Sequence, residues 1–261
     1  MFRKFRILIL LLILLGVSVQ TWLIDARIGS WESTVSVGIY PIAFDDSPET
    51  ARFIDELDVE SFADIESWFQ DEFKHYGINL QIPVRIVLGP RVMARPPALP
   101  QGKPGIFDAI VWSLKLRWWA SRHDDLGKSR SVPQVRLFVL FHPARDGEVL
   151  PHSIGLDKGK IGVIHVFASE RQKRQNAVII AHELLHTFKA TDKYDPITLQ
   201  PIHPHGYAQP DRQPLLPQRA AEIMGGRIPI SLTESRIPAG LSEAIIGPAT
   251  ALEIGLKSGD Q

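Results

Sequence analysis

The stretch HELLHTFKATDKYD, residues 182–195, holds side chains whose types and spacing could carry out hydrolysis. Two histidines stand four residues apart, a glutamate directly follows the first, and an aspartate follows six residues after the second. On a helix, with a rotation of about 100° per residue, His182 and His186 point in nearly the same direction, one turn apart. Both rings could therefore bind one metal ion, while Glu183 projects to the side and could bind a water.

Zinc suits this donor set, because it accepts histidine and carboxylate ligands and keeps a fourth position for water when three ligands come from the protein. Glu183 could then take the proton of that water and pass it to a leaving amine. The chain has no cysteine, which excludes thiolate nucleophiles, cysteine-bound metals and disulfides. Asp192 is the first candidate for the third ligand, and His203, His205 and Asp195 are alternatives. The competing interpretation is an amphipathic helix with surface histidines.

The flanking sequence predicts the elements that would position these residues. Ser169 and Gln172 form the pattern of a capping box ahead of an apolar run that continues into the HELLH stretch, which predicts a helix there. Periodicity and bounding Gly and Pro residues predict four strands, two earlier helices, and a closing helix interrupted near Pro248. The strands are expected at 34–44, 83–89, 135–142 and 161–168, and the helices at 62–77, 106–125 and 241–256.

The pattern HExxHxxxxxD, followed by Lys193 and Tyr194, resembles the zinc-binding segment of the metzincin metallopeptidases. It is most similar to the snapalysin-like form, HExxHxxGxxD. The turn Glu222-Ile-Met-Gly225 resembles the methionine turn of that clan. The resemblance covers residues 178–195 and 221–226. It implies an α+β, metzincin-like fold in which a mixed sheet packs on the active-site helix and a C-terminal helix follows the methionine turn.

The resemblance also implies roles for individual residues. His182, His186 and Asp192 would bind zinc, Glu183 would be the general base, and Met224 would be structural. The strand at residues 161–167 would be an edge strand that pairs with an extended substrate. Tyr194 and Tyr207 are candidates for donating a hydrogen bond to the oxyanion, and for each the alternative is a tyrosine packed against its loop.

Lys189 departs from the family pattern, which has glycine where the helix ends and the chain turns toward the third ligand. A lysine in left-handed geometry costs roughly 1 kcal/mol, which is small beside the free energy of metal binding. We therefore predict that Lys189 lies just past the helix end, in or near left-handed geometry, with Asp192 still reaching the metal.

The N-terminus begins with the basic residues MFRKFR and continues into the apolar run ILILLLILLGVSVQTWLI, residues 7–24. This predicts either an uncleaved membrane anchor or a cleaved signal peptide at 1–24, then a spacer at 25–33. In both cases the remaining chain, expected to be one metallopeptidase domain at 34–261, faces the extracytoplasmic side. The 29 basic and 29 acidic residues balance, which gives no reason to expect a nucleic-acid partner.

The segment at residues 111–125 mixes three tryptophans with basic residues. Near-helical spacing favours a core helix, and the alternatives are a helix at a membrane interface or a surface that stacks on glycans.

Together these observations predict a zinc-dependent endopeptidase that acts on protein or peptide substrates outside the cytoplasm, attached to the membrane or secreted. Two alternatives remain: a non-catalytic zincin-fold binding or scaffold protein, and a zinc amidase acting on cell-wall peptides. The presence of Glu183 together with all three ligands favours an active enzyme.

Overall fold

A computed structural model describes residues 28–100, 102, 105–126, 132–145 and 149–256 of the chain. The predicted anchor or signal segment, residues 1–24, lies outside the described residues. Within the described ranges, no helix is both long enough and apolar enough to cross a membrane.

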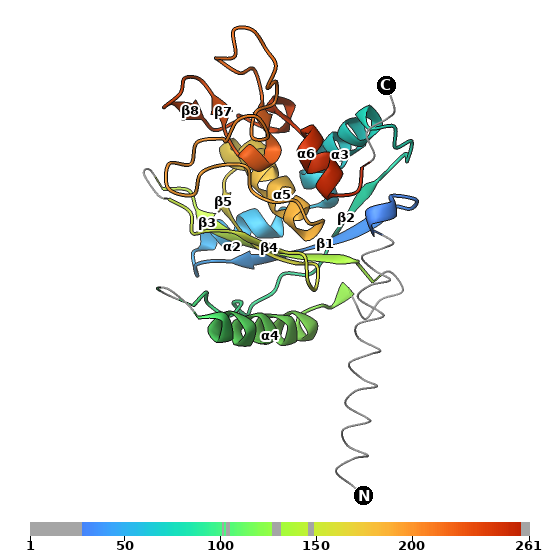
Figure 1. The fold of residues 1–261 in the computed structure, drawn as a ribbon. Coiled ribbons are helices and arrows are strands. Elements are labelled where there is room, and N and C mark those ends of the chain that lie inside the picture. The colour runs from blue at the N-terminus through green and yellow to red at the C-terminus, as the bar shows by residue number, and fades with distance from the viewer. Residues whose placement is uncertain (1–27, 101, 103–104, 127–131, 146–148, 257–261) are drawn as a thin grey trace, which may run out of the picture.

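A five-stranded sheet forms the centre of the molecule (Figure 1). Its strands lie in the order β2 (Val84–Leu88), β1 (Val35–Ala43), β3 (Val135–Pro143), β5 (Ile161–Ala168) and β4 (Ile154–Leu156). The first four are parallel, and β4 pairs antiparallel with β5 at the edge. The expectation of an α+β fold with a mixed sheet is confirmed.

Helices cover both faces of the sheet. In Figure 1, α3 (Ala63–His75), α5 (Lys173–Thr187) and α6 (Pro248–Glu253) lie above the sheet and α4 (Ile106–Arg122) lies below it. A further helix, α2, spans Pro48–Asp55. Because successive strand residues point to opposite faces, β1 and β3 contribute to two cores. Val37 and Val139 pack with α3 and α5, whereas Tyr40 and Phe138 pack with α4.

The C-terminal third is made of short elements joined by loops. Two pairs of short strands lie here: β6 (Ala221–Glu222) with β9 (Ala244–Ile245), and β7 (Ile228–Pro229) with β8 (Ser235–Arg236). Two 3₁₀ turns also lie here, η4 (Ile223–Gly225) and η5 (Leu241–Glu243). Earlier in the chain, the 3₁₀ turns are η1 (Val59–Phe62) and η3 (Glu170–Gln172).

Three local expectations are wrong. The capping box at Ser169 does not form, because its backbone carbonyl accepts the N–H of Gln172 and closes the 3₁₀ turn η3, so α5 begins only at Lys173. The closing helix expected at 241–256 is α-helical only from Pro248 on, because the chain first forms η5 and β9. Pro248 then begins α6, where its missing N–H costs nothing, instead of interrupting a longer helix.

The expected edge strand is the third correction. The strand at 161–167 is β5, which lies between β3 and β4, and the shorter β4 takes the edge position. The chain reaches β5 from β4 through a tight turn in which Gly159 and Lys160 both have positive φ. That turn folds β4 back against β5 as a hairpin.

The described part of the predicted spacer at 25–33, which begins at Ile28, places side chains in the core. Ile28 and Trp31 are buried, and the Trp31 indole N–H donates to the carbonyl of Ile254 at 2.7 Å. The Trp31 ring also contacts Phe73 and Phe188 edge to face. The packed domain therefore includes residues before β1.

Candidate metal centre

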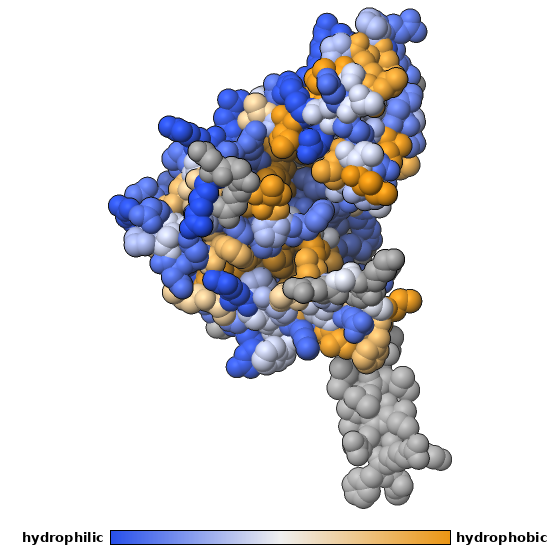
Figure 2. All heavy atoms as spheres, turned by 90° about the vertical axis from the view of Figure 1, so that its left-hand side faces the viewer, coloured by the Kyte–Doolittle hydropathy of each residue, from blue (hydrophilic) through white to orange (hydrophobic). Residues whose placement is uncertain are grey.

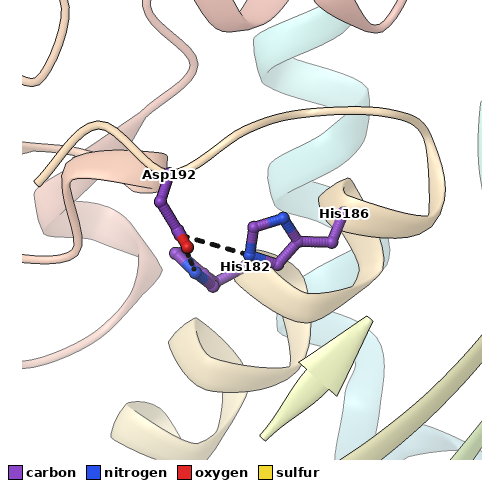
Figure 3. A group of neighbouring side chains, drawn as sticks. All are labelled: His182, His186 and Asp192. Atoms are coloured by element: carbon purple, nitrogen blue, oxygen red, sulfur yellow. Dashed lines mark ion pairs between the residues drawn. The ribbon is translucent and has the colours of Figure 1, made fainter. Parts of the chain in front are cut away.

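Three side chains converge on one point above the sheet. His182 and His186 project from α5, and Asp192 projects from the loop that follows it (Figure 3). Asp192 Oδ1 lies 3.2 Å from Nε2 of each histidine. For tetrahedral bonds of 2.0–2.1 Å, neighbouring zinc ligands are separated by about 3.3 Å. The donor set and its spacing therefore fit a zinc-sized ion.

Backbone carbonyls fix the orientation of both histidines. Nδ1 of His182 donates to the carbonyl of Ile223, and Nδ1 of His186 donates to that of Ala190, both at 2.8 Å. A carbonyl can only accept a hydrogen bond, so Nδ1 carries the proton in each ring and Nε2 faces Asp192. Such backbone partners hold metal-binding histidines in the correct tautomer.

The charges of this cluster favour the binding of a cation. Burial works to raise the pKa of Asp192, but hydrogen bonds from the two histidines outweigh it and hold the pKa well below its usual range. Burial likewise works to lower the pKa of His182, and Asp192 and Glu183 outweigh it and raise the pKa. The two anionic groups thus favour positive charge at the His182 ring, which either a proton or a metal ion supplies.

Lys189 lies just past the C-terminal end of α5, as predicted. It has φ of +84°, directly after Thr187 and Phe188 close α5. Its N–H donates to His186 O at 3.0 Å, and the N–H of Ala190 donates to Leu185 O at 3.1 Å. These two bonds form a Schellman motif, whose left-handed position is most often occupied by glycine. The prediction of left-handed geometry is confirmed.

The loop that carries Asp192 is fixed by the last helix. Glu253 on α6 accepts hydrogen bonds from the N–H and hydroxyl of Thr191, at 2.9 and 2.7 Å, and from Nζ of Lys193 at 2.7 Å. The backbone N–H of Lys193 donates to Met224 O at 2.9 Å. Both neighbours of Asp192 are therefore held in place. No sequence signal singled out Glu253, because its partners lie about sixty residues earlier.

The turn predicted to resemble a methionine turn is η4, directly beside the cluster. Met224 is fully buried, and Gly226 follows in left-handed geometry with φ of +71°. The carboxylate of Glu222 accepts the N–H of Gly225 at 2.8 Å and the hydroxyl of Thr250 at 2.6 Å. The turn is thus held rigidly, and it presents the carbonyl that orients His182.

Glu183 lies next to the cluster and is nearly buried, with 7% of its surface exposed. One carboxylate oxygen, Oε2, has no hydrogen-bond partner among the described residues. The N–H of Gly155 donates to the carboxylate, but burial dominates and raises the pKa of Glu183. A buried carboxylate oxygen without a partner is costly, so it marks the position where a water or substrate group would bind.

Gly155 lets β4 approach this glutamate. A Cβ atom at Gly155 would lie 2.1 Å from Glu183 O and 2.7 Å from the Cβ of His186. Only glycine permits this contact between the edge strand and α5. No local pattern singles out Gly155, because its role depends on the pairing of β4 with β5, which was not expected.

Two hollows, with volumes of about 540 and 490 Å³, meet at the cluster and share His182, Glu183, Tyr194 and Leu199. The larger is mostly apolar; the smaller runs along the edge strand. The larger is lined also by Val149, Leu150, Phe167, Val178, Ile179, Ile223 and Ile237, and the smaller by His152, Ser153, Ile154, Gly155 and Pro196. Figure 2 shows a hollow, with apolar side chains inside it, on the face that carries the ends of β3 and β5.

The two candidate tyrosines differ in position. Tyr194 lines both hollows and donates a hydrogen bond to Asp192. Burial, followed by the charges of Asp192 and Glu183, raises its pKa to about 12, so the phenol stays protonated. Tyr207 is buried against His203 and, in the described part of the chain, lines neither hollow. The alternative of loop packing fits Tyr207 better.

The alternative third ligands lie elsewhere. The carboxylate of Asp195 accepts the N–H groups of Ile197 and Thr198, and the His203 ring faces Pro210 O at 3.2 Å. His205 is exposed. Within the described ranges, only His182, His186 and Asp192 are grouped closely enough to hold a metal ion.

Three further histidines lie on or near the strands, and packing or the smaller hollow accounts for them. His142 and His165 face each other, Nε2 to Nδ1, at 2.8 Å, and burial lowers the pKa of each to about 4. This pair is distinct from the metal cluster. His152 lies on the smaller hollow and could contact a substrate there.

Comparisons with known proteins give weak structural similarity. No family model matches the chain. No curated protein matches it either. Among solved structures, wild-type OgpA from Akkermansia muciniphila matches with a TM-score of 0.38 and 12% identity, over 87% of this chain and 62% of that chain. Catalytically inactive OgpA in complex with an O-glycopeptide, glycodrosocin, matches with a TM-score of 0.36 and 10% identity, over 87% and 61%. The chain thus spans less than two thirds of OgpA, and the function proposed below rests on the geometry of the centre.

Proposed function

We propose that this protein is a zinc-dependent endopeptidase. One observation carries the proposal: two histidine nitrogens and a carboxylate oxygen converge beside a buried glutamate that has an unpaired oxygen. His182, His186 and Asp192 would hold the metal, and Glu183 would work on the water beside it. Zinc bound there would polarise that water and stabilise the negative charge that develops on the substrate carbonyl.

Glu183 is suited to move the proton. Its raised pKa brings it closer to neutrality than an exposed glutamate, which favours both accepting a proton and releasing it again. It would take the proton of the attacking water at Oε2 and deliver it to the nitrogen of the leaving amine. Gly155 N–H holds the carboxylate in position for both steps.

The surroundings suit an extended peptide. The outer edge of β4 can pair with an added strand, and its residues 153–155 line the smaller hollow. The larger, apolar hollow receives a side chain on the other side of Glu183. A substrate that continues on both sides of the cleaved bond is the substrate of an endopeptidase. Tyr194 would donate a hydrogen bond from its phenol to the carbonyl oxygen as charge develops there, and the phenol would keep its proton.

The proposal includes a location outside the cytoplasm, based on the basic and apolar residues 1–24. A buried carboxylate with one unpaired oxygen destabilises the fold, and a scaffold protein would gain nothing that offsets this cost. The catalytic alternative is therefore favoured. A zinc amidase acting on cell-wall peptides would use the same centre and differ only in substrate.

The test compares wild type with Glu183→Gln. We expect one zinc per chain in both forms, cleavage of a protein or peptide library by wild type, and a loss of rate of about 10²–10⁴-fold in the variant. Glu170→Gln is the matched control, because Glu170 is exposed in η3 and lines neither hollow. Absence of zinc, or equal rates for wild type and Glu183→Gln, would refute the proposal. Zinc binding without cleavage of any peptide would support the scaffold alternative, and cleavage restricted to cell-wall peptides would support the amidase.

A further inference from the structure

Helix α4 exposes a continuous row of large apolar side chains, which repeat every four residues along one face. The row consists of Ile106, Ile110, Leu114 and Trp118, whose exposed fractions range from 52 to 84%, and Phe107 beside it is 75% exposed. The opposite face, with Leu116 and Trp119, is buried against the sheet.

This exposure was not expected from the sequence, which favoured inward packing for the tryptophans of this segment. Trp119 does pack inward, but Trp118 faces solvent. Isolated exposed apolar residues are common, whereas a contiguous apolar row on a soluble surface usually marks an interaction site.

Basic residues accompany the row. Lys115 and Arg122 are exposed on the same helix, and the Arg122 guanidinium lies 5.0 Å from the centre of the Trp118 ring. Asp108 is the one acidic residue between Ile106 and Arg122. An apolar face with tryptophan, flanked by Lys and Arg, is the pattern of a helix that lies in the interface of an anionic membrane.

The chain enters the domain near this helix. The apolar run at 7–24 is separated from Ile28, the first described residue, only by Asp25, Ala26 and Arg27. From there the chain forms β1, whose Val37 pairs with Val135 at the start of β3. The C-terminal end of α4 points toward this same end of the sheet (Figure 1), and Leu126, just beyond that end, lies beside Gly38 of β1. A bilayer that holds the apolar run would therefore lie within reach of α4.

We propose that α4 rests on the surface of the membrane, with its apolar row among the lipid headgroups and its basic residues against anionic lipid. The metal centre lies on the opposite face of the sheet from α4 (Figure 1). Docking of α4 would thus turn the two hollows away from the bilayer, toward substrates in the surrounding fluid. This inference does not depend on the proposed peptidase activity.

The test uses the full chain, which has no native cysteine and therefore accepts a single label. Ile110→Cys and Leu232→Cys would each carry an environment-sensitive fluorophore in vesicles that contain phosphatidylglycerol. Leu232 is the matched control, because it is 81% exposed and lies between β7 and β8, across the sheet from α4. We expect a spin-labelled phospholipid to quench the label at position 110 several-fold more than the label at position 232.

A second variant tests the charge contribution. Lys115→Glu with Arg122→Glu, in the Ile110→Cys background, should reduce this quenching, and exchange of phosphatidylglycerol for phosphatidylcholine should do the same. Equal quenching at positions 110 and 232 would overturn the proposal. The proposal would also be overturned if, in detergent, the label at position 110 is shielded from solvent and light scattering gives the mass of a dimer. The apolar row would then be assigned to contact with a second copy of the chain.

Discussion

Replacing Lys189 by glycine should stabilise the protein, because Lys189 holds a backbone conformation that glycine adopts without steric cost. At φ of +84°, a residue with a Cβ atom carries a penalty of roughly 1–2 kcal/mol. Glycine removes that penalty but gives the unfolded chain more freedom, which offsets about 0.5–1 kcal/mol. The middle of these two ranges gives a net gain for Lys189→Gly over Lys189→Ala of about 0.8 kcal/mol. The alanine variant corrects for whatever the lysine side chain contributes.

Urea denaturation of the metal-free protein would measure this difference, and a thermal scan should show a shift of about 1–4 °C. Gln70 gives a control of opposite sign, because it is exposed in the middle of α3, where glycine costs about 1 kcal/mol relative to alanine. If Lys189→Ala and Lys189→Gly unfold at the same urea concentration, the reasoning is refuted, because a Cβ atom at residue 189 then carries no steric penalty.

Three further perturbations probe the elements around the centre. Glu253→Gln should lower the free energy of unfolding by about 1–2 kcal/mol at neutral pH and weaken zinc binding about 10-fold or more, since Lys193 loses its ionic partner. Burial works to raise the pKa of Glu253, but hydrogen bonds from Lys193 and Thr191 outweigh it and lower the pKa. This stabilisation should therefore be complete above about pH 4.3 and disappear as the pH falls further; a pH-independent difference would contradict it. Gly155→Ala should lower the free energy of unfolding by about 1–3 kcal/mol, because the new Cβ would lie 2.1 Å from a carbonyl oxygen of α5. Gly29→Ala is the control and should be nearly neutral, because a Cβ there meets nothing within 4 Å. Tyr194→Phe should retain zinc and lower kcat about 10²-fold with little change in KM; an unchanged kcat would show that the phenol only packs.

Local patterns in the sequence were sufficient to predict that His182, His186 and Asp192 lie together. His182 and His186 meet because helical spacing brings them together, and Lys189 adopts left-handed geometry because a helix that must turn sharply needs such a residue. The strands at 34–44, 83–89, 135–142 and 161–168 correspond to β1, β2, β3 and β5, since buried parallel strands read as continuous apolar runs.

The features that were missed depend on contacts between distant segments. The edge strand β4 has only three residues, which is too short to show a periodic pattern. The hydrogen bonds from Thr191 and Lys193 to Glu253 join residues about sixty positions apart. The outward face of α4 was missed because a helix that is apolar on both sides gives no periodic indication of which side is buried.

The link between Glu253 and the loop that carries Asp192 also sets the order in which the centre can be completed. During synthesis both histidines leave the ribosome well before α6, so the early chain presents two ligands without the helix that secures the third. Such an incomplete site binds metal weakly, because the ligand loop must still be ordered. Tight metal capture would thus wait until the whole domain has folded, and a chain that crosses a membrane unfolded would acquire its metal on the far side.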